Sequence, residues 1–334
     1  MNESRKGVMD DGAKPQAAYA ASLADVAAAA KRIAPYAHRT PVMTCSTLDA
    51  MAGRKLYFKC EHLQKIGAFK FRGACNAVMK LDDDVARRGV VTHSSGNHAQ
   101  ALALAAKLRG IESHIVMPRT ASRIKRAAVG GYGGRVILCE PDSTSREGTA
   151  AKVQEETGAT LIHPYNHPDI IAGQGTCAME LLDEVPQLDA IITPVGGGGL
   201  LSGTCIATRG LAPHVKVFAG EPLAADDAAR SIATGELQPQ PSPPKTIADG
   251  LLTALGPLTF AIIRDHVTRI ITVTEDEIVR AMRLLWQRAK LLVEPSSAVA
   301  LAAVLSDEMK SLEDIDEIGI ILSGGNVDID NLPW

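Results

Sequence analysis

The sequence predicts an α/β protein whose parallel sheets carry helices on both faces. From Gly89 onward, short runs rich in β-branched residues alternate with longer stretches that have helical spacing. Aromatic residues make up only 4% of the chain and hydrophobic residues 46%, so the core consists mainly of small and aliphatic side chains, which suit helices packed on sheets. A length of 334 residues is enough for one large or two modest domains.

The balance of charge excludes several classes of protein. The 35 basic and 38 acidic residues leave a net charge of −3, which excludes a strongly basic nucleic-acid binder. A charged fraction of 22% is close to the globular average and excludes bulk disorder. No apolar run approaches the ~20 residues needed to cross a bilayer, and the N-terminus, which carries Glu3, Asp10 and Asp11, lacks the apolar core of a secretory signal. We therefore expect a soluble cytoplasmic protein with a flexible tail over residues 1–20.

The elements of the first half begin with an Ala-rich helix that ends before Pro35. Helices are expected where apolar residues recur every three or four positions, and strands where β-branched residues run together between polar turns. These patterns predict a helix over 23–33, strands over 55–60, 90–92, 114–117, 135–139 and 160–163, and helices over 98–108, 122–129 and 145–156.

The second half continues the same alternation. The patterns predict helices over 171–184, 200–210, 275–290 and 295–309, and strands over 190–195, 215–219 and 318–322. The proline-rich stretch over 235–244 indicates an ordered surface connection rather than a domain linker, because strongly patterned sequence resumes at once. The six cysteines have no C-x-x-C or metal-knuckle spacing, so we expect reduced, buried thiols.

The most distinctive motifs lie near the ends of predicted strands, where open α/β sheets bind ligands. The first places Lys70 between two phenylalanines, in Gly67-Ala68-Phe69-Lys70-Phe71-Arg72-Gly73-Ala74. One interpretation is a helix start whose lysine extends its amine to solvent along an apolar surface. The other is a partly desolvated amine with a lowered pKa that forms a Schiff base.

The second motif, His93-Ser94-Ser95-Gly96-Asn97-His98, follows the strand over 90–92 and opens a helix. Its serines and asparagine are consistent with simple helix caps. They also offer hydroxyls and backbone amides at the place where a helix N-terminus binds an anion.

The third motif consists of four successive glycines, Gly196 to Gly199, between a strand and a helix. Without side chains, consecutive backbone N–H groups can converge on a phosphate, and a tight structural turn seldom needs four glycines. The segment has neither the Gly-Lys-Ser/Thr of a Walker loop nor the acidic residue that follows a dinucleotide-binding G-x-G-x-x-G. It therefore predicts phosphate binding and argues against ATPase and dehydrogenase functions.

The fourth motif, Ser323-Gly324-Gly325-Asn326, ends the last predicted strand. It is consistent with a turn alone, or with a serine hydroxyl placed against a ring nitrogen that stays unprotonated.

Taken together, the four motifs resemble the fold type II pyridoxal-phosphate (PLP) enzymes, in particular the serine racemases and the serine/threonine dehydratases. The resemblance runs from about Ile33 to Asp328, with the motifs in family order, and Thr246–Gly250 and Glu294–Ser296 add to it. It implies the tryptophan synthase β-like fold, with two unequal open parallel or mixed sheets flanked by helices. Alanine at position 68, where many members have serine, favours the plant- and fungal-like branch.

The resemblance also implies which residues hold the cofactor. Lys70 would form the Schiff base with PLP, with Phe69 beside the cofactor ring and Asn97 bonded to the ring 3′-oxygen. The loop Gly196 to Gly199 would hold the phosphate, and Ser323 would face the pyridine nitrogen. A serine there leaves the nitrogen largely neutral, which favours prompt β-elimination or reprotonation of the substrate carbanion over transamination.

For the substrate, the resemblance implies a two-base mechanism. Racemisation needs an acid or base on each face of the planar carbanion, and Lys70 and Ser95 would supply them. The substrate carboxylate would lie on Ser94, Ser95 and the amides near Asn97 and His98.

Two further segments match the family less specifically. Arg146 matches an arginine that approaches the substrate, and it is equally consistent with an ordinary helix arginine. Glu221, the Ala225 carbonyl and Asp227 would supply oxygen ligands to Mg²⁺, Ca²⁺ or Mn²⁺. Without the resemblance, these acids are typical of a helix N-terminus.

The function implied is a PLP-dependent serine racemase that also dehydrates serine to pyruvate and ammonia. The alternatives are a threonine or threo-3-hydroxyaspartate ammonia-lyase, a β-replacement enzyme like acetylserine sulfhydrylase, and a non-catalytic ligand-binding module of the same fold. The cation segment and Ser95 argue against β-replacement. The intact Lys70, the four glycines and Ser323 argue against a non-catalytic module.

The family pattern further implies a division into domains. We expect a small domain over 85–165, which contributes Ser95 and Asn97, and a discontinuous large PLP-binding domain over 21–84 and 166–334. Movement of the small domain would close the site over a small amino-acid substrate. We expect a homodimer, with neither a nucleic-acid nor a membrane partner.

Overall fold

The computed structural model describes residues 19–121, 123–240 and 244–334. Most of the predicted tail over 1–20, and residues 241–243 of the proline-rich stretch, therefore lie outside the described residues. At the end of the predicted tail, the Tyr19 hydroxyl donates a hydrogen bond to a carboxylate oxygen of Asp265 (2.8 Å) and the Tyr19 ring packs edge-on against His266. Residue 19 is thus part of the folded body.

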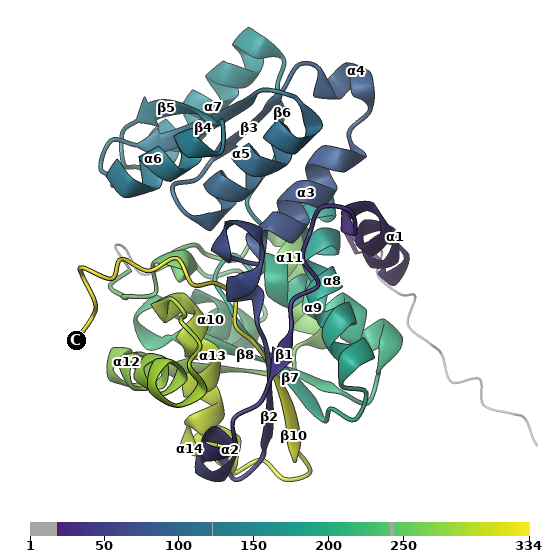
Figure 1. Cartoon of the computed structure of the whole chain (residues 1–334), viewed down its shortest axis with the longest axis vertical. Helices are drawn as coiled ribbons and strands as arrows, with labels where there is room; N and C mark the ends of the chain where they lie inside the picture. The colour runs from purple at the N-terminus through teal and green to yellow at the C-terminus, as the bar shows by residue number, and fades with distance from the viewer. Residues whose placement is uncertain (1–18, 122, 241–243) are drawn as a thin grey trace, which may run out of the picture.

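Two sheets organise the chain (Figure 1). The larger has the strand order β1-β2-β10-β7-β8-β9 and the smaller β5-β4-β3-β6. In the described part of the chain, all strand pairs are parallel except β1 with β2. The strands are β1 (Val42–Met43), β2 (Lys55–Lys59), β3 (Val90–His93), β4 (Ser113–Pro118), β5 (Arg135–Cys139), β6 (Thr160–Leu161), β7 (Ala190–Pro194), β8 (Lys216–Pro222), β9 (Arg269–Val273) and β10 (Glu317–Ile321).

Helices connect the strands and cover both sheets (Figure 1). The α-helices are α1 (Leu23–Ile33), α2 (Ser46–Ala52), α3 (Lys70–Lys80), α4 (Asp83–Ala86), α5 (Asn97–Arg109), α6 (Arg123–Gly131), α7 (Ser143–Thr157), α8 (Pro168–Glu184), α9 (Gly199–Leu211), α10 (Asp227–Thr234), α11 (Pro257–His266), α12 (Glu275–Leu284), α13 (Pro295–Leu305) and α14 (Asp307–Lys310). Short 3₁₀ turns are η1 (Glu61–Leu63), η2 (Lys65–Gly67), η3 (Leu223–Ala225) and η4 (Asp249–Leu251), and η5 (Leu285–Ala289) is a π-helical turn.

Successive residues of the buried strands face different apolar cores. In β7, Ile192 packs with α12 and α13 on one face of the large sheet, and Ile191 packs with α8 and α9 on the other. In β4, Ile115 packs with α3 and α5, and Val116 packs with α7. This alternation explains why the strands are apolar throughout. The predicted fold class, two unequal parallel or mixed sheets flanked by helices, is confirmed.

The structure corrects the last predicted helices. The α-helix expected over 275–290 ends at Leu284 and continues as the π-helical turn η5. The helix expected over 295–309 is interrupted at Ser306, whose backbone is extended and whose hydroxyl accepts the Met309 N–H (3.1 Å), which starts α14. Ser306 ends the apolar helix before it and caps the short charged helix Asp307–Lys310 after it, so one hydroxyl divides the predicted helix in two.

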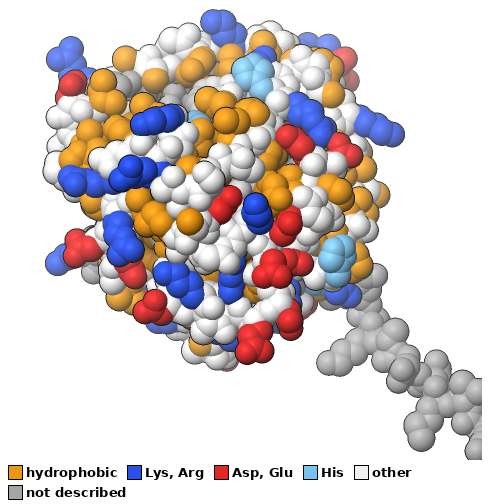
Figure 2. Space-filling model, turned by 60° about the horizontal axis from the view of Figure 1, so that its bottom comes forward, with side chains coloured by type: hydrophobic (Ala, Val, Ile, Leu, Met, Phe, Trp, Pro, Cys, Tyr) orange, Lys and Arg blue, Asp and Glu red, His pale blue; other side chains and the backbone are white. Residues whose placement is uncertain are grey.

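The outer surface carries charges of both signs. On the face seen in Figure 2, acidic and basic side chains are interspersed among apolar ones. None of the helices built from the described residues is long and apolar enough to span a membrane.

Candidate active site

A cavity of about 580 Å³ lies at the carboxyl ends of strands from both sheets. Its wall includes the segments that follow β3, β7 and β10, and the start of α3. The volume is typical of a small-molecule site. Every residue that the sequence predicted for cofactor or substrate lines this cavity, namely Phe69, Lys70, Ser94, Ser95, Asn97, His98, Arg146, Gly196, Gly197, Gly198, Gly199 and Ser323.

Lys70 is the first residue of α3 and is held beside the end of β10. The Phe69 N–H donates to the Ser323 carbonyl (2.9 Å), and Lys70 Nζ donates to the Pro164 carbonyl (3.0 Å). Burial lowers the pKa of Lys70 to about 8, although the charge of Glu294 opposes the shift. A sizeable fraction of the amine is therefore neutral near pH 8, as a nucleophile or a proton acceptor requires.

The glycine loop Gly196–Gly199 connects β7 to α9 and is closely packed by neighbouring side chains. Gly198 has φ of 84°, and a Cβ on Gly197 would lie 2.3 Å from the Tyr165 ring. Side chains at these two positions are therefore excluded by backbone conformation and by packing. The loop leaves its backbone exposed to the cavity at the N-terminus of the 13-residue helix α9, a position that suits an anion.

The turn from β3 into α5 places its polar side chains along the same cavity. Ser94 and Ser95 are half-buried there, and α5 begins at Asn97. The Asn97 amide donates to Glu294 (3.0 Å) and its carbonyl oxygen accepts from the Asn326 side chain (2.8 Å). The Asn97 side chain is thus fixed in orientation by two residues that are distant from it in sequence.

The histidines of the cavity are neutral near pH 7. Burial holds the pKa of His98 well below its usual value, and its Nε2 lies 3.1 Å from the Ile162 carbonyl. Burial also lowers the pKa of His93, and that of the neighbouring His163 to about 4. The His163 ring packs edge-on against both His93 and Tyr165, so these rings form one aromatic wall.

Sequence reasoning missed Glu294 as a site residue. It is buried in the cavity wall and accepts from Asn97 and from the Asn326 N–H (3.1 Å). Burial, with the negative charge of Asp249 nearby, raises the pKa of Glu294 to about 7. The signal available was its place before Pro295, at the start of a predicted helix, where an acidic residue is also a common cap.

Arg146 lines the cavity from the first turn of α7, beside His93 and Glu147. Its Nε is buried and has no hydrogen-bond partner among the residues that the structure describes. The position therefore offers a cationic donor to a ligand.

The predicted cation ligands lie outside the cavity. The Glu221 carboxylate accepts the N–H groups of Ala228 (2.9 Å) and Ala229 (2.8 Å), and Asp227 accepts that of Leu255 (2.9 Å). Asp227 Oδ1 is buried and unpartnered within the described part of the chain. Burial raises the pKa of Glu221 to about 8 and that of Asp227 to about 6.

An orphaned carboxylate oxygen beside a second buried carboxylate is chemically suited to a hard divalent cation. No group of three or more His, Cys, Asp or Glu side chains suited to a metal occurs among the described residues. A cation at this place would therefore need the Ala225 carbonyl and water as further ligands.

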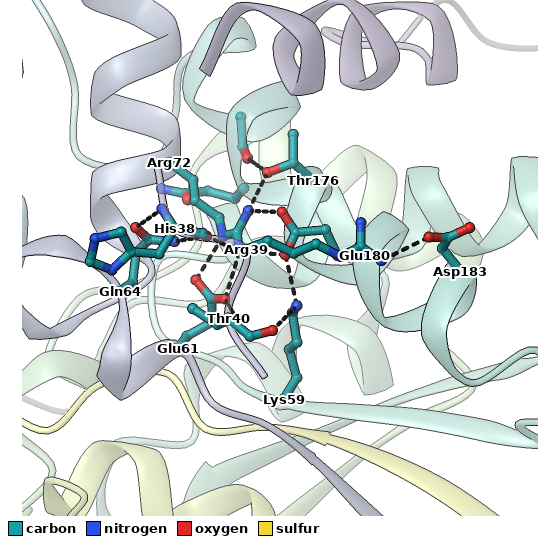
Figure 3. Close-up of polar contacts among 12 residues, drawn as sticks. His38, Arg39, Thr40, Lys59, Glu61, Gln64, Arg72, Thr176, Glu180 and Asp183 are labelled. Atoms are coloured by element: carbon teal, nitrogen blue, oxygen red, sulfur yellow. Dashed lines mark hydrogen bonds and ion pairs between the residues drawn. The ribbon is translucent and has the colours of Figure 1, made fainter. Parts of the chain in front are cut away.

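A buried ionic network surrounds Arg72, which lies in α3 two residues after Lys70 (Figure 3). Arg72 donates to both oxygens of Glu61 (2.7 and 2.8 Å) and to both oxygens of Glu180 (2.7 and 2.8 Å). Lys59 also donates to Glu180 (2.7 Å) and to the Thr40 carbonyl (2.7 Å). The network connects α3 to β2, η1 and α8. It therefore fixes the position of α3, the helix that begins with Lys70.

Comparison with known proteins identifies the family. Residues 33–324 match the family model described as "Pyridoxal-phosphate dependent enzyme". The chain belongs to this family. The chain is 53% identical over 312 residues to a serine racemase from Dictyostelium discoideum, covering 93% of this chain and 96% of the relative.

Two other relatives bear on the reaction. A β-hydroxyaspartate dehydratase from Paracoccus denitrificans is 50% identical over 316 residues, covering 95% of this chain and 99% of the relative. The solved structure of maize serine racemase superimposes with a TM-score of 0.92 at 51% identity, covering 93% of this chain and 95% of that one. The family, its fold and its cofactor agree with the resemblance deduced from the motifs.

The residues present fit PLP. A buried lysine with a lowered pKa suits an aldehyde, and a glycine loop at a helix N-terminus suits a phosphate. Ser323, 4% exposed, offers a neutral hydroxyl rather than a carboxylate to the cavity. The aromatic ring of Phe69 borders the same space.

Proposed function

We propose that the protein is a PLP-dependent serine racemase that also dehydrates serine to pyruvate and ammonia. The observation that carries the proposal is that Lys70 and Ser95, from different elements, line one cavity that also contains the glycine loop. The serine racemases among the relatives support the choice of substrate. PLP, once bound, would withdraw electrons from the substrate α-carbon and make its C–H bond acidic.

Lys70 and Ser95 exchange the α-proton. Near neutral pH a useful fraction of Lys70 is neutral, because burial lowers its pKa to about 8, so Nζ accepts the α-proton of one enantiomer. The Ser95 hydroxyl delivers a proton to the other face of the α-carbon, and the two groups exchange roles in the reverse direction. One base alone would return the proton to the face from which it came.

The remaining residues bind and orient. The backbone of Gly196–Gly199 would hold the cofactor phosphate, Phe69 would border its ring, and the Ser323 hydroxyl would be the partner for the ring nitrogen. The N-terminus of α5, with Ser94 and the amides of Asn97 and His98, binds the substrate carboxylate. The side-chain amide of Asn97 is held in place by its hydrogen bond to Glu294.

Three broader features belong to the same proposal. The chain divides into a small domain over 85–165 and a large domain over 21–84 and 166–334, and the small domain closes over the substrate. Glu221, the Ala225 carbonyl and Asp227 hold a divalent cation, which the unpartnered Asp227 oxygen supports. The protein acts as a homodimer in the cytoplasm.

The test is incubation with L-serine and Mg²⁺, with D-serine measured by chiral separation and pyruvate by a coupled assay. The wild type forms both products, and Ser95→Ala loses racemisation while it retains some dehydration. Ser297→Ala is the matched control, because Ser297 is buried, does not line the cavity, and its hydroxyl has no partner in the described residues. Pyruvate without D-serine in the wild type would assign the chain to the ammonia-lyases, and racemisation by Ser95→Ala would overturn the two-base mechanism.

A second candidate, a threo-3-hydroxyaspartate ammonia-lyase, is favoured by Arg146. Its buried Nε, unpartnered in the part of the chain described, offers a site for a second substrate carboxylate. The dehydratase relative supports it. Conversion of 3-hydroxyaspartate to oxaloacetate and ammonia, faster than serine turnover and abolished by Arg146→Leu, would establish this function. Equal effects of the substitution on both substrates would reject it.

A further inference from the structure

The hydroxyl of Thr259 connects α11 to the glycine loop. Thr259 is buried in the first turn of α11 and is not among the residues that line the cavity. Its Oγ1 lies 2.9 Å from the Gly197 carbonyl and 3.0 Å from the Gly256 carbonyl, and it accepts the Gly256 N–H (3.0 Å). The Thr259 carbonyl in turn lies 3.3 Å from the Ser202 hydroxyl, at the start of α9.

A hydroxyl carries one hydrogen, so Thr259 donates to one of the two carbonyls at a time. The Gly256 carbonyl already accepts the Phe260 N–H (2.8 Å) as the first bond of α11. The Gly197 carbonyl is buried, and in the described residues Thr259 is its hydrogen-bond partner. Buried carbonyls are rarely left unpaired. The Thr259 hydroxyl therefore donates its hydrogen to the Gly197 carbonyl.

This bond fixes the direction of the peptide between Gly197 and Gly198. In a trans peptide the carbonyl and the following N–H point in opposite directions. When the Gly197 carbonyl points toward Thr259, the Gly198 N–H points away from Thr259, which stands outside the cavity. A reversal of this peptide would turn a carbonyl oxygen, in place of an N–H, toward a bound anion.

The loop packs closely against α11 and the segment before it. A Cβ on Gly198 would meet Leu255 at 2.7 Å, and Ile263 and Thr259 of α11 at 2.8 and 2.9 Å. The same absence of side chains that permits this close packing leaves glycine peptides free to rotate. A directional bond is therefore required to select one orientation.

We propose that Thr259 is a positioning residue that holds the glycine loop in its phosphate-binding orientation. The proposal rests on the proposed function, in which this loop holds the cofactor phosphate. Loss of the hydroxyl weakens binding of the phosphate group and leaves binding of the pyridoxal ring unchanged. Thr259 acts through Gly197 and Gly198 and does not touch the cofactor.

The experiment compares pyridoxal 5′-phosphate with pyridoxal, which carries the same aldehyde and ring without the phosphate. Full-length holoenzyme is dialysed against graded concentrations of each compound, and bound cofactor is read from its visible absorbance. The variants are Thr259→Val, which has nearly the same shape without a hydroxyl, and Thr259→Ser, which keeps the hydroxyl. Thr208→Val is the matched control, because Thr208 lies buried in α9 and its hydroxyl has no partner in the structure as described.

In Thr259→Val, Kd for pyridoxal 5′-phosphate should rise about tenfold, the factor that corresponds to ~1.4 kcal/mol. Kd for pyridoxal should stay unchanged, and the ³¹P NMR signal of bound cofactor should shift. Thr259→Ser should restore both, and Thr208→Val should match the wild type. If Thr259→Val does not fold, the comparison of Thr259→Ala with Thr259→Ser supplies the same contrast.

The outcomes distinguish a failure of the role proposed for Thr259 from a failure of the proposed function. Equal weakening for both compounds, or no weakening in the Thr259 variants without a hydroxyl, would overturn the inference. A wild type that binds pyridoxal as tightly as pyridoxal 5′-phosphate would instead reject the assignment of the loop to the phosphate.

Discussion

Arg72→Met should destabilise the protein far more than the loss of an exposed ion pair. In the wild type the Arg72 guanidinium donates to two oxygens of Glu61, two of Glu180, the Thr176 hydroxyl and the His38 carbonyl. Arg72 and Glu61 are both fully buried. Methionine fills much of the space and removes every one of these donors.

The expected magnitude follows from the charge left behind. Glu61 retains a hydrogen bond from Thr40, and its carboxylate stays buried without its principal counter-charge, which costs about 3–5 kcal/mol. For a chain of this length an unfolding entropy of about 0.7 kcal/mol/K converts this cost into a decrease in Tm of about 4–7 °C. Arg39→Met is the matched control, because Arg39 pairs with Asp183 on the surface of the same region (Figure 3), where a pair contributes less than about 1 kcal/mol.

The pH dependence gives a second measure of the same effect. Burial raises the pKa of Glu61, and in the wild type the charge and hydrogen bonds of Arg72 more than reverse this, so the pKa is lowered. Without Arg72 burial dominates and the carboxyl takes up a proton as the pH falls. The difference in Tm between Arg72→Met and wild type should therefore shrink from pH 8 to pH 5, measured by circular dichroism. A decrease in Tm no larger than that of Arg39→Met, or one independent of pH, would show that Glu61 does not depend on Arg72 as its counter-charge.

Three other predictions follow from the site. Burial lowers the pKa of Lys70 to about 8, so the rate at which cofactor-free protein binds PLP should rise with pH up to about 8 and then stay constant. Stopped-flow absorbance would measure this rate. A rate that still rises steeply at pH 9.5 would contradict the prediction. Burial and Asp249 raise the pKa of Glu294 from 4.5 to about 7, so the charged form destabilises the fold, and Glu294→Gln should raise Tm at pH 8 in cofactor-free protein. That gain should disappear as the pH falls toward 4.5, and a gain that persists there has another cause. Mg²⁺ should raise the Tm of the wild type, and EDTA should reverse this increase. The Asp227→Asn variant should show no increase. A wild type whose Tm does not respond to Mg²⁺ would reject the proposed cation site.

Local sequence patterns were sufficient for most of the fold. The buried strand β7 and the partly exposed edge strand β5 were both predicted within one residue of their ends, because both their composition and their flanking turns are distinct. The strand β9, which has the same length as β5, was missed because it follows α11 with no turn of glycine or proline to mark its start. The break at Ser306 was missed because it depends on a single capping hydroxyl.

The motifs predicted which residues meet at the cavity but not what holds them there. Glu294, which orients Asn97, lies 197 residues from it in sequence, and no periodicity links the two positions. The same holds for Thr259, whose bond to Gly197 spans 62 residues. Residues that bind a ligand occur at strand ends and in glycine loops, where their type is diagnostic. Residues that position them come from any packed element and become visible only with the tertiary contacts.

The charge distribution of the cavity points to Arg146 as the residue that would select the substrate. His93, His98 and the neighbouring His163 are neutral near pH 7 because burial lowers the pKa of each. Apart from these histidines and Lys70, Arg146 is the single basic side chain among the described residues that line the cavity. An α-carboxylate can be bound by backbone N–H groups at the start of α5, with no cation required. For a second carboxylate on the β-carbon, Arg146 offers a charged, bidentate donor. Under the proposed function, serine and 3-hydroxyaspartate would therefore be distinguished by how far the Arg146 guanidinium reaches toward the β-carbon, and Lys70 and Ser95 would serve both substrates.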